Sequence, residues 1–550
     1  MKPIIRRIND YIDHRVERPI KVQYPRSITP EFLQNIKPAD VDSDQWAEGC
    51  FWVINAVLSQ TIEGRFKNND SDYVAVCSLT LKMVLGNDYT LYVDALVNSG
   101  ILVSDNEFSV KHHICMGYKL PTQLIQEPWA FTTIKGKFIV KSVKKHRRKK
   151  SQELKKVNKD LYHLTRWLIE DTLILDKTAA LDFLNTLKGV MQRELEKRTL
   201  KPGSKNRVKS FLDLRIRIYK TSIERWKLTN GFTVDNSGGR LHTPLTSIPS
   251  IFRNFITTRD GEELISLDIK NSQPFHMVFL FQKRFWRKSK KAATMYGTDQ
   301  ELYNQLLHDE GYIMFQKQLL RVDNQAIGIF SFKNLVLTGK LYEFICSRLG
   351  GIYKSRKKVN PFGTRRLAKK QFLRMMYYDP RKINPDVHQF FSEFIKLFPA
   401  EGSIMSLLKK RSYRDFSIFL QKLEAKMILH QVCRVIFKEN PDIPLYTIHD
   451  SIITTKQYSN LVMDKIKTTY VEAIGMAPQI EKNTWSEVNA QESVVKYVNG
   501  KLDESNIDTP GLQLNTPLEH ASFDQDFYQS HVPDFLKYET LVPGVLTTKR

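Results

Sequence analysis

The chain has 550 residues, of which 41% are hydrophobic and 11% aromatic, so it can build three or four domains with sizeable cores. It has no apolar run of about 18 residues and no apolar signal core near its start, and its five scattered cysteines fit neither a disulfide framework nor a zinc site. The formal net charge of +25 indicates a polyanionic partner, with nucleic acid as the commonest kind and an anionic membrane surface as the alternative. We expect a cytoplasmic, monomeric protein that does not bind membranes.

Residues 1–125 are predicted to form an N-terminal domain that contains a small unit at about 72–120. The stretches "DYVAVCSLTLKMVL" and "YTLYVDALVNSG" have helical apolar spacing, and "ILVSDNEFSV" is typical of a hairpin with its turn at Asp105 and Asn106. Two helices followed by a hairpin indicate a winged helix. Such a unit often binds duplex DNA, and the alternative is a winged helix used only for protein contacts.

Residues 126–230 form a basic region whose pattern is helical. Within it, "KSVKKHRRKKSQELKK" (Lys141 to Lys156) is too charged to pack into a core. The run is either a charged helix surface or linker, or a track that neutralises phosphates.

Residues 231–500 mix strand and helix patterns and contain a first candidate acid. In "ELISLDIKNSQPFHMVFLF", a buried strand ends at Asp268 and the chain then turns into an apolar helix. An acid in this position is either a helix N-cap or a metal ligand. Two acids at the ends of two apolar strands can meet on adjacent strands of one sheet and hold two Mg²⁺ ions.

The stretch "RRLAKKQFLRMMYY" has strong helix formers and neither proline nor glycine. Arg365, Lys369, Leu373 and Tyr377 recur every four residues and so share one face of the predicted helix. Two cations at one end and a tyrosine at the other suit a nucleoside triphosphate, with the cations on the phosphates and the ring near the base. A solvent-facing basic helix is the alternative.

A second candidate acid lies in "YTIHDSIITT" (Tyr446 to Thr455), where a strand-like stretch has His449 and Asp450 at its centre. The pair is either the turn of a hairpin or the tip of a catalytic hairpin at which Asp450 holds a metal. Past Gly500 the composition becomes acidic and rich in turn residues, so residues 501–550 are predicted to be a disordered tail.

The order and content of these segments resemble the family A DNA polymerases and the phage-type single-subunit RNA polymerases. In that superfamily motif A is an acid that ends a strand, here Asp268. Motif B is Arg-x-x-x-Lys followed eight residues later by Tyr, here Arg365, Lys369 and Tyr377, and motif C is His-Asp between apolar residues, here His449 and Asp450.

Two further stretches agree with this resemblance. "SGGRLHTPLTSIPSIFRNFI" is similar to the Gly-Arg-Leu stretch of the family, in which Arg240 would contact the primer–template duplex. "LQKLEAKMILHQV" is similar to the helix before motif C, in which Gln421 would read the minor-groove side of the new pair. The resemblance covers residues 230–460 and implies an α+β right-hand polymerase. Its parts would be a thumb-like region at 126–230 and a palm-and-fingers catalytic domain at 231–500.

The resemblance also implies a reaction and its cofactor. Asp268 and Asp450 would hold two Mg²⁺ ions, with Mn²⁺ as a substitute, and His449 would pack beside the primer end. Arg365 and Lys369 would neutralise the triphosphate of an incoming nucleotide, with Lys369 as the candidate proton donor to pyrophosphate. Tyr377 would position the templating base, so the partners are a primer–template, most often DNA, and nucleoside triphosphates.

The sequence departs from the family pattern at several positions. Motif A lacks the glutamate that excludes ribose, and Phe275 is the candidate for that sugar gate. Ser272 and His276, four and eight residues after Asp268, match the RNA polymerases, as does Ser451 after motif C. We expect DNA-directed DNA synthesis without proofreading, suited to a plasmid or other mobile element. RNA polymerase or primase activity and a non-catalytic, DNA-binding replication initiator or regulator are the alternatives.

Overall fold

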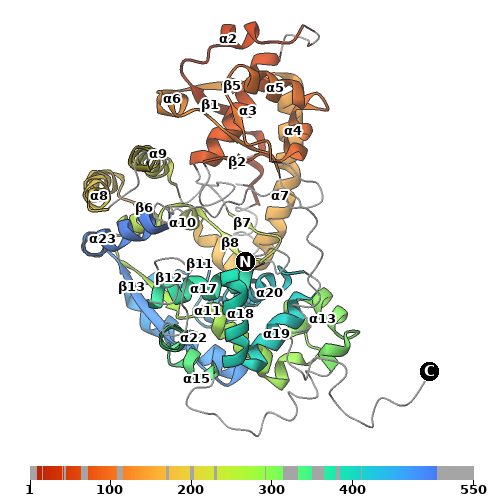
Figure 1. Cartoon of the computed structure of the whole chain (residues 1–550), viewed down its shortest axis with the longest axis vertical. Helices are drawn as coiled ribbons and strands as arrows, with labels where there is room; N and C mark the ends of the chain where they lie inside the picture. Colours follow the sequence, from red (N-terminus) through yellow and green to blue (C-terminus); the bar gives the residue numbers. More distant parts are fainter. Residues whose placement is uncertain are drawn as a thin grey trace, which may run out of the picture. The chain divides into compact units, whose positions relative to one another are not determined.

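The computed structural model describes residues 9–10, 12–14, 16–39, 41, 45–62, 72–107, 115–168, 172–198, 204–227, 232–291, 293–313, 332–349, 364–378, 385–410 and 412–504. The chain divides into two compact units. Unit 1 comprises residues 1–233, 243–264 and 484–512, and unit 2 comprises residues 234–242, 265–483 and 513–550. Both units combine many helices with small sheets, which confirms the predicted α+β class (Figure 1).

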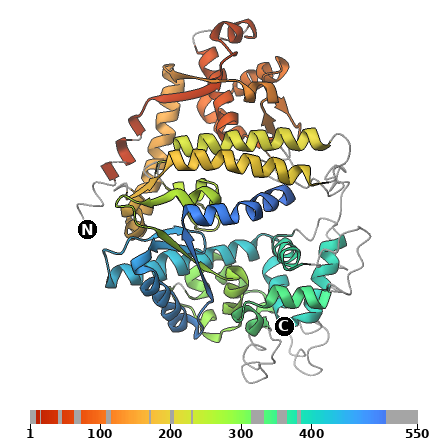
Figure 2. The same ribbon diagram turned by 90° about the vertical axis from the view of Figure 1, so that its left-hand side faces the viewer.

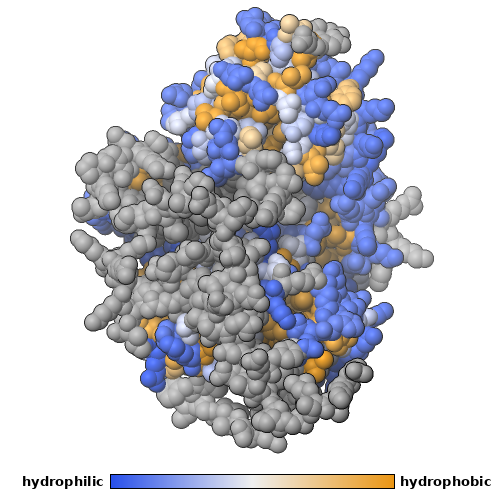
Figure 3. Space-filling view, turned by 45° about the vertical axis from the view of Figure 1, so that its right-hand side comes forward, coloured by the Kyte–Doolittle hydropathy of each residue, from blue (hydrophilic) through white to orange (hydrophobic). Residues whose placement is uncertain are grey.

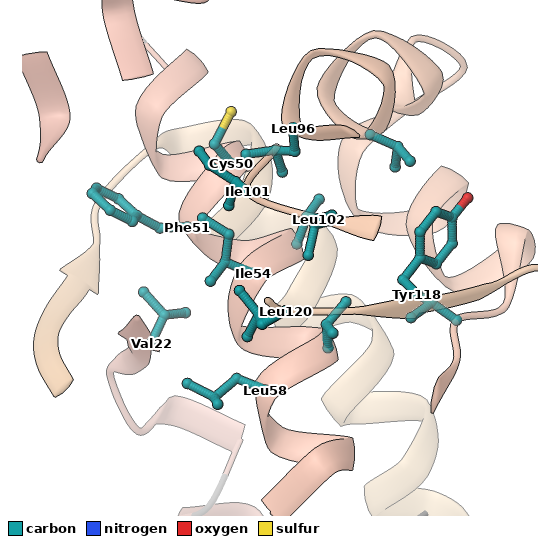
Figure 4. Packing of buried hydrophobic residues seen from close by; sticks show 14 of the residues in the cluster. Val22, Cys50, Phe51, Ile54, Leu58, Leu96, Ile101, Leu102, Tyr118 and Leu120 are labelled. Atoms are coloured by element: carbon teal, nitrogen blue, oxygen red, sulfur yellow. The ribbon is translucent and has the colours of Figure 1, made fainter. Parts of the chain in front are cut away.

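The N-terminal part of unit 1 is built around one helix, α3 (Trp46–Ile62), and a two-stranded sheet. Strand β1 (Ile20–Pro25) pairs antiparallel with β5 (Trp129–Ile134), and the short helices α2 (Pro30–Asn35) and α6 (Thr122–Gln126) lie in the same part of the chain. Apolar side chains of α3 pack against those of the neighbouring strands and helices in one continuous core (Figure 4). Burial of this core provides the main stabilisation of the region.

The residues at 72–120 form a compact arrangement of short elements. In chain order they are β2 (Val74–Ala75), α4 (Ser78–Leu85), α5 (Tyr89–Asn98), β3 (Val103–Ser104) and β4 (Gly117–Lys119). The three strands form an antiparallel sheet in the order β2-β4-β3.

One prediction for this region needs correction. The first helical stretch was predicted to begin at residue 72, but Val74 lies on a strand and pairs with Tyr118, because the β-branched start of the stretch completes the small sheet. Strand β3, the first strand of the predicted hairpin, pairs antiparallel with β4. Residues 108–110 lie outside the described residues. Asn106, in the predicted turn, has a φ of +53°, which asparagine tolerates better than most residues.

A long helix, α7 (Lys137–Thr165), contains the whole basic run of residues 141–156, so this run is a helix surface rather than a linker. It leads through η1 (Arg166–Leu168) to β6 (Leu173–Leu175), which pairs antiparallel with β9 (Ile256–Thr258). The chain continues through the long helices α8 (Lys177–Glu196) and α9 (Ser204–Arg225).

Helices α8 and α9 lie side by side, and α23 (Glu487–Glu504) packs on α8 (Figure 2). The hydroxyls of Tyr219 and Tyr497 are 3.0 Å apart, and Asn499 Nδ2 donates to Glu194 Oε2 at 3.0 Å, so α23 is tied to both helices. Unit 1 also contains α10 (Pro244–Ser247) and η3 (Ser250–Phe255). Of the tail predicted at 501–550, residues 501–504 end α23 and residues 505–550 lie outside the described residues.

Unit 2 contains a four-stranded sheet in the order β11-β12-β10-β13. Its strands are β10 (Leu264–Ile269), β11 (Tyr446–Ile448), β12 (Ser451–Thr455) and β13 (Ile480–Trp485). The neighbouring helical elements are α11 (Ser272–Met277), η4 (Val278–Phe281), α20 (Asp415–Ala425), the π-helical η6 (Lys426–Val432), α21 (Cys433–Glu439), η7 (Lys456–Tyr458) and α22 (Ser459–Ile474). The short strands β7 (Thr233–Val234) and β8 (Leu241–His242) pair with each other.

A second group of helices in unit 2 carries the predicted nucleotide-binding stretch. Helix α17 (Arg365–Tyr377) packs against α16 (Leu341–Leu349) and α18 (Pro385–Leu397), with buried aromatic rings at the contacts. The other elements are η5 (Lys283–Trp286), α12 (Met295–Thr298), α13 (Gln300–Leu306), α15 (Phe332–Leu337) and α19 (Pro399–Lys409).

One face of the molecule shows how polar and apolar residues are distributed on the described surface. On the face in Figure 3 most of the residues drawn in colour are hydrophilic, and hydrophobic ones form small groups between them. Within the described ranges, no helix is both long and apolar enough to cross a membrane.

Candidate active site

Asp268 lies on β10, between the neighbouring strands β12 and β13. Its Oδ1 accepts hydrogen bonds from the hydroxyls of Ser266, at 3.1 Å, and Ser451. Its Oδ2 accepts from Asn483 Nδ2 at 2.6 Å. The carboxylate is therefore held by side chains from three adjacent strands, which fixes its orientation at the sheet.

Asp450 and His449 form the two-residue turn between β11 and β12, because Ile448 pairs directly with Ser451. His449 has a φ of +53°, which costs a residue with a Cβ about 1 kcal/mol. Burial, together with the nearby charges of Glu424 and Asp268, raises the pKa of Asp450 to about 7. His449 and Asp450 are thus the turn of a hairpin, which was the first of the two alternatives predicted for this stretch. A turn at this place does not exclude the second alternative, in which Asp450 holds a metal.

A third acid, Glu424 on α20, was not predicted from the sequence. Its side chain is 2% exposed, and its Oε1 accepts hydrogen bonds from Nε and Nη2 of Arg240 at 3.1 and 2.5 Å. Its Oε2 accepts from the hydroxyl of Ser272 at 2.7 Å. Directly after this acid the helix changes to the π-helical segment η6, a deviation that often accompanies functional sites.

Arg240 is positioned by a tight turn between β7 and β8. Asp235 accepts hydrogen bonds from the backbone N–H of Gly238 and, at 3.0 Å, from that of Arg240. A Cβ on Gly238 would lie 2.8 Å from Oε1 of Gln421, so glycine allows the turn to pack closely against α20. The predicted contact residues Arg240 and Gln421 are thereby brought together.

The structure also places Tyr377 beside two glutamines. Its hydroxyl accepts hydrogen bonds from Nε2 of Gln273 at 2.6 Å and from Nε2 of Gln421 at 3.1 Å. Its ring is 39% exposed. Three segments that are separated by 104 and 44 residues thus meet at one exposed polar cluster, and two of its three members were predicted.

Arg365 and Lys369 lie near the start of α17 and are exposed. Arg365 Nε donates to Glu343 Oε1 at 2.6 Å, and its guanidinium lies 5.6 Å from the ring centre of Tyr342. Thr364 caps the helix by accepting from the Leu367 N–H at 3.3 Å. Among the described residues, no hydrogen bond or ion pair joins either cation to the acids of the sheet.

Phe275 occupies a different environment from the one predicted. Its ring is 1% exposed and packs against Phe279 and Tyr470. A ring buried in this way cannot touch a nucleotide sugar, so we give Phe275 a packing role. The adjacent His276 is fully buried, its Nε2 lies 2.9 Å from the Tyr470 hydroxyl, and burial lowers the pKa of its imidazole.

The acids offer the oxygen ligands that Mg²⁺ prefers. Within the described residues there is no group of three or more His, Cys, Asp or Glu side chains arranged for a metal. Magnesium at phosphate-transfer sites is often held by one or two carboxylates together with substrate phosphates, so two acids suffice chemically. Burial and, after it, repulsion by Glu424 and Asp268 raise the pKa of Asp450, and a bound cation would favour its charged form.

Comparisons with known proteins give a limited result. No protein-family model matches the sequence, and no match is found among curated proteins. One similar solved structure is the POL domain of Pol1 from M. smegmatis in complex with DNA primer-template and dNTP. The identity is 11% and the TM-score 0.38, with 64% of this chain and 74% of that chain covered. Because this likeness is low, the function proposed below rests on the residues and their geometry.

Proposed function

We propose that the protein is a template-directed nucleotidyltransferase, and more specifically a DNA-directed DNA polymerase with a palm, fingers and thumb. The observation that carries the proposal is the placement of Asp268 on β10 and Asp450 in the turn that leads into the adjacent strand β12. Ser451 joins the two positions, because it follows Asp450 directly and donates a hydrogen bond to Asp268. The adjacency of these two positions supports the proposal.

Asp268 and Asp450 would hold one or two Mg²⁺ ions between them and the substrate phosphates. When bound, such ions activate a hydroxyl for attack and stabilise charge on the leaving group. Asp268 is kept in place by Ser266, Ser451 and Asn483, so its orientation does not depend on the metal.

In the proposed reaction the primer 3′-oxygen forms a bond to the α-phosphorus of the incoming nucleotide. The bond from that phosphorus to the β-phosphate oxygen breaks, pyrophosphate leaves, and the 3′-hydroxyl loses its proton. Arg365 and Lys369 would neutralise the triphosphate, and Lys369 would give a proton to pyrophosphate. Positioning and charge stabilisation would supply most of the rate enhancement.

The primer–template would lie against the polar cluster and the neighbouring turn. Tyr377 would sit beside the templating base, with its hydroxyl oriented by the two glutamines. Arg240, anchored to Glu424 through Nε and Nη2, would direct its Nη1 to the duplex, and Gln421 would contact the minor-groove side of the new pair. His449 would pack beside the primer end.

Primer extension tests this proposal. A labelled primer–template is incubated with Mg²⁺ and deoxynucleotides, using the natural protein, Asp450→Ala and the matched control Asp464→Ala, whose acid is exposed on α22. We expect extension by the natural protein and the control and none by Asp450→Ala. Duplex binding without extension under any condition would leave a non-catalytic, DNA-binding initiator or regulator as the better account.

RNA synthesis is the second candidate, and one observation favours it. Ser451 takes the place that glutamate has in the DNA enzymes, and here its hydroxyl binds Asp268. The same assay with ribonucleotides, and with the primer left out, separates the candidates. Products made only from ribonucleotides would replace DNA synthesis with RNA polymerase or primase activity.

A further inference from the structure

Helix α7 carries two distinct groups of basic side chains. The first faces the N-terminal segment of unit 1: Lys144 Nζ lies 2.6 Å from Glu17 Oε2 and Lys155 Nζ lies 2.6 Å from Asp13 Oδ2. Arg147 Nη1 donates to the Arg18 carbonyl oxygen at 2.5 Å. These cations hold the helix against its own unit.

The second group, which we call the outer stripe, consists of five exposed lysines on a neighbouring face: Lys141, Lys145, Lys149, Lys156 and Lys159. Their steps of four, four, seven and three residues place them on one side of a helix. The buried side chains of α7, including Ile139, Ser151 and Asn158, lie on the other side. In the described part of the chain no acidic side chain pairs with any lysine of the outer stripe.

The N-terminal half of the outer stripe is a line of like charges, whereas Glu153 and Asp160 lie three or four residues from lysines of its other half. Lys141, Lys145 and Lys149 follow one another at the four-residue spacing at which like charges repel and destabilise a helix. The stripe runs for about 27 Å along the helix axis. A linear polyanion laid along it would remove the repulsion and meet a cation at every turn or two. The phosphate backbone of a nucleic acid duplex is such a polyanion.

The short helix α5 does not present a row of cations to the phosphates of a duplex. Its exposed positions are Thr90, Leu91, Asp94 and Asn98, with no cation among them. Leu91, Asp94 and Asn98 line a cavity of about 340 Å³ together with Ile36 and Pro38. If residues 72–120 act as a DNA-binding winged helix, α5 would be the helix that lies in the major groove of the duplex. An acidic and partly apolar face is a poor match for phosphates.

We propose that the outer stripe of α7 binds the phosphate backbone of duplex DNA without regard to sequence, and that α5 does not bind DNA. The proposal deepens the proposed function, because the duplex is the same primer–template or its downstream extension. It concerns residues of unit 1 alone. The stripe can therefore fail to bind DNA in a protein that transfers nucleotides, and it can bind DNA in a protein that does not.

The test measures the binding of a labelled 25-base-pair duplex to the full-length protein by fluorescence anisotropy. EDTA is present and nucleotides are absent, and the salt concentration is varied. The variant is the triple substitution Lys145→Gln, Lys149→Gln and Lys156→Gln. Each lost phosphate contact lowers the slope of log K against log salt by about 0.9, so we expect the slope to fall by about 2 to 3 and the affinity at physiological salt to drop at least tenfold.

Two controls make the result decisive. The triple variant Lys82→Gln, Lys438→Gln and Lys496→Gln removes the same charge from exposed lysines on other helices and should keep the natural slope within about 1. The variant Asp94→Lys on α5 should change the slope of log K against log salt by no more than about 0.9, the value for one phosphate contact. The duplex should also raise the melting temperature of the natural protein more than that of the stripe variant.

Three outcomes would overturn the proposal. The first is an unchanged slope in the stripe variant, and the second is an equal fall in the stripe variant and the lysine control. The third is a stripe variant that loses binding to vesicles of phosphatidylserine and phosphatidylcholine while keeping its duplex affinity. That outcome would make the outer stripe a membrane-binding surface. Asp450→Asn measured beside them tests the proposed function separately, because it should bind duplex with the natural slope even though it cannot extend a primer.

Discussion

Glu424 accepts two hydrogen bonds from the guanidinium of Arg240, at 3.1 Å from Nε and 2.5 Å from Nη2, at a site where the carboxylate is 2% exposed. A buried pair of this kind holds both partners in one geometry, because neither charge can be left alone at low cost. Glu424 also raises the pKa of Asp450 through its charge. One side chain therefore connects Arg240 with Asp450.

Substitution of Glu424 by glutamine should destabilise the protein strongly. The change leaves the Arg240 guanidinium without its counter-charge in a buried position, so we expect the free energy of unfolding in urea to fall by about 3 kcal/mol. The matched control is Glu439→Gln, which breaks the more exposed ion pair with Lys465 and should cost no more than about 0.5 kcal/mol. Equal costs for the two variants would show that the Arg240 pair is not an anchor.

The raised pKa of Asp450 predicts a pH-dependent stability of the metal-free protein. The ordinary value is 3.8 and the folded value is about 7, so the folded protein binds this proton more tightly than the unfolded chain does. The free energy of unfolding should therefore fall as the pH rises from about 4 to 7. Asp450→Asn removes this penalty, and in EDTA at pH 8.5 it should be more stable than the natural protein by about 2 kcal/mol.

Asp464→Asn is the control for this measurement, because its carboxylate is exposed and the substitution should have no comparable effect. Addition of Mg²⁺ at pH 8.5 should raise the melting temperature of the natural protein and of the control, but much less that of Asp450→Asn. A stability difference that stays the same from pH 5 to pH 8.5 would contradict the assignment of this proton to Asp450.

Local patterns in the sequence were sufficient to place the main elements of the site. The buried strand around Asp268, the hairpin around Asp450 and the helix from Arg365 to Tyr377 follow from apolar periodicity and helix propensity. The meeting of Tyr377 with Gln421 was implied only by the order of the motifs. Each residue lies on a helix that the sequence predicts. The contact between the two helices depends on the tertiary fold, which local sequence patterns do not specify.

Other parts of the site could not be predicted, for physical reasons. Glu424 lies at a helical position that looks like an ordinary polar face until Arg240 and Ser272 are brought to it. Asn483 reaches Asp268 only because β13 joins the sheet beside β10. Phe275 was expected at the nucleotide, yet the helix that follows Asn271 turns its ring into the core, and nothing in the local pattern distinguishes the two directions.

Tyr377→Phe should weaken nucleotide binding more than it weakens the fold. The substitution removes the acceptor for Gln273 and Gln421, but the ring is partly exposed and both amides can turn to water. We expect a loss of no more than about 1 kcal/mol in stability. In single-nucleotide incorporation, KM for the nucleotide should rise about tenfold with a smaller change in kcat. Tyr413→Phe, which also removes a hydroxyl that accepts a hydrogen bond, is the control and should leave both constants unchanged.

Lys369 offers a test of the proposed triphosphate site. The residue is exposed and its substitution should not disturb the fold, so Lys369→Gln should keep the natural melting temperature. If its ammonium neutralises the triphosphate and protonates pyrophosphate, the rate of single-turnover incorporation should fall by about 10²-fold or more. Lys370→Gln, one residue further round the helix, should reduce this rate far less. Similar losses in both variants would indicate a diffuse charge effect and not a specific contact.

The left-handed backbone at His449 allows the role of its ring to be separated from the role of its backbone. Glycine and asparagine accept a φ of +53° more readily than other residues, so His449→Gly and His449→Asn should fold with a stability within about 1 kcal/mol of the natural protein. His449→Ala keeps the strain and loses the ring. If the imidazole packs beside the primer end, all three variants should reduce primer extension to a similar degree. If instead only the shape of the turn matters, because it presents Asp450, the glycine variant should extend primers as well as the natural protein does.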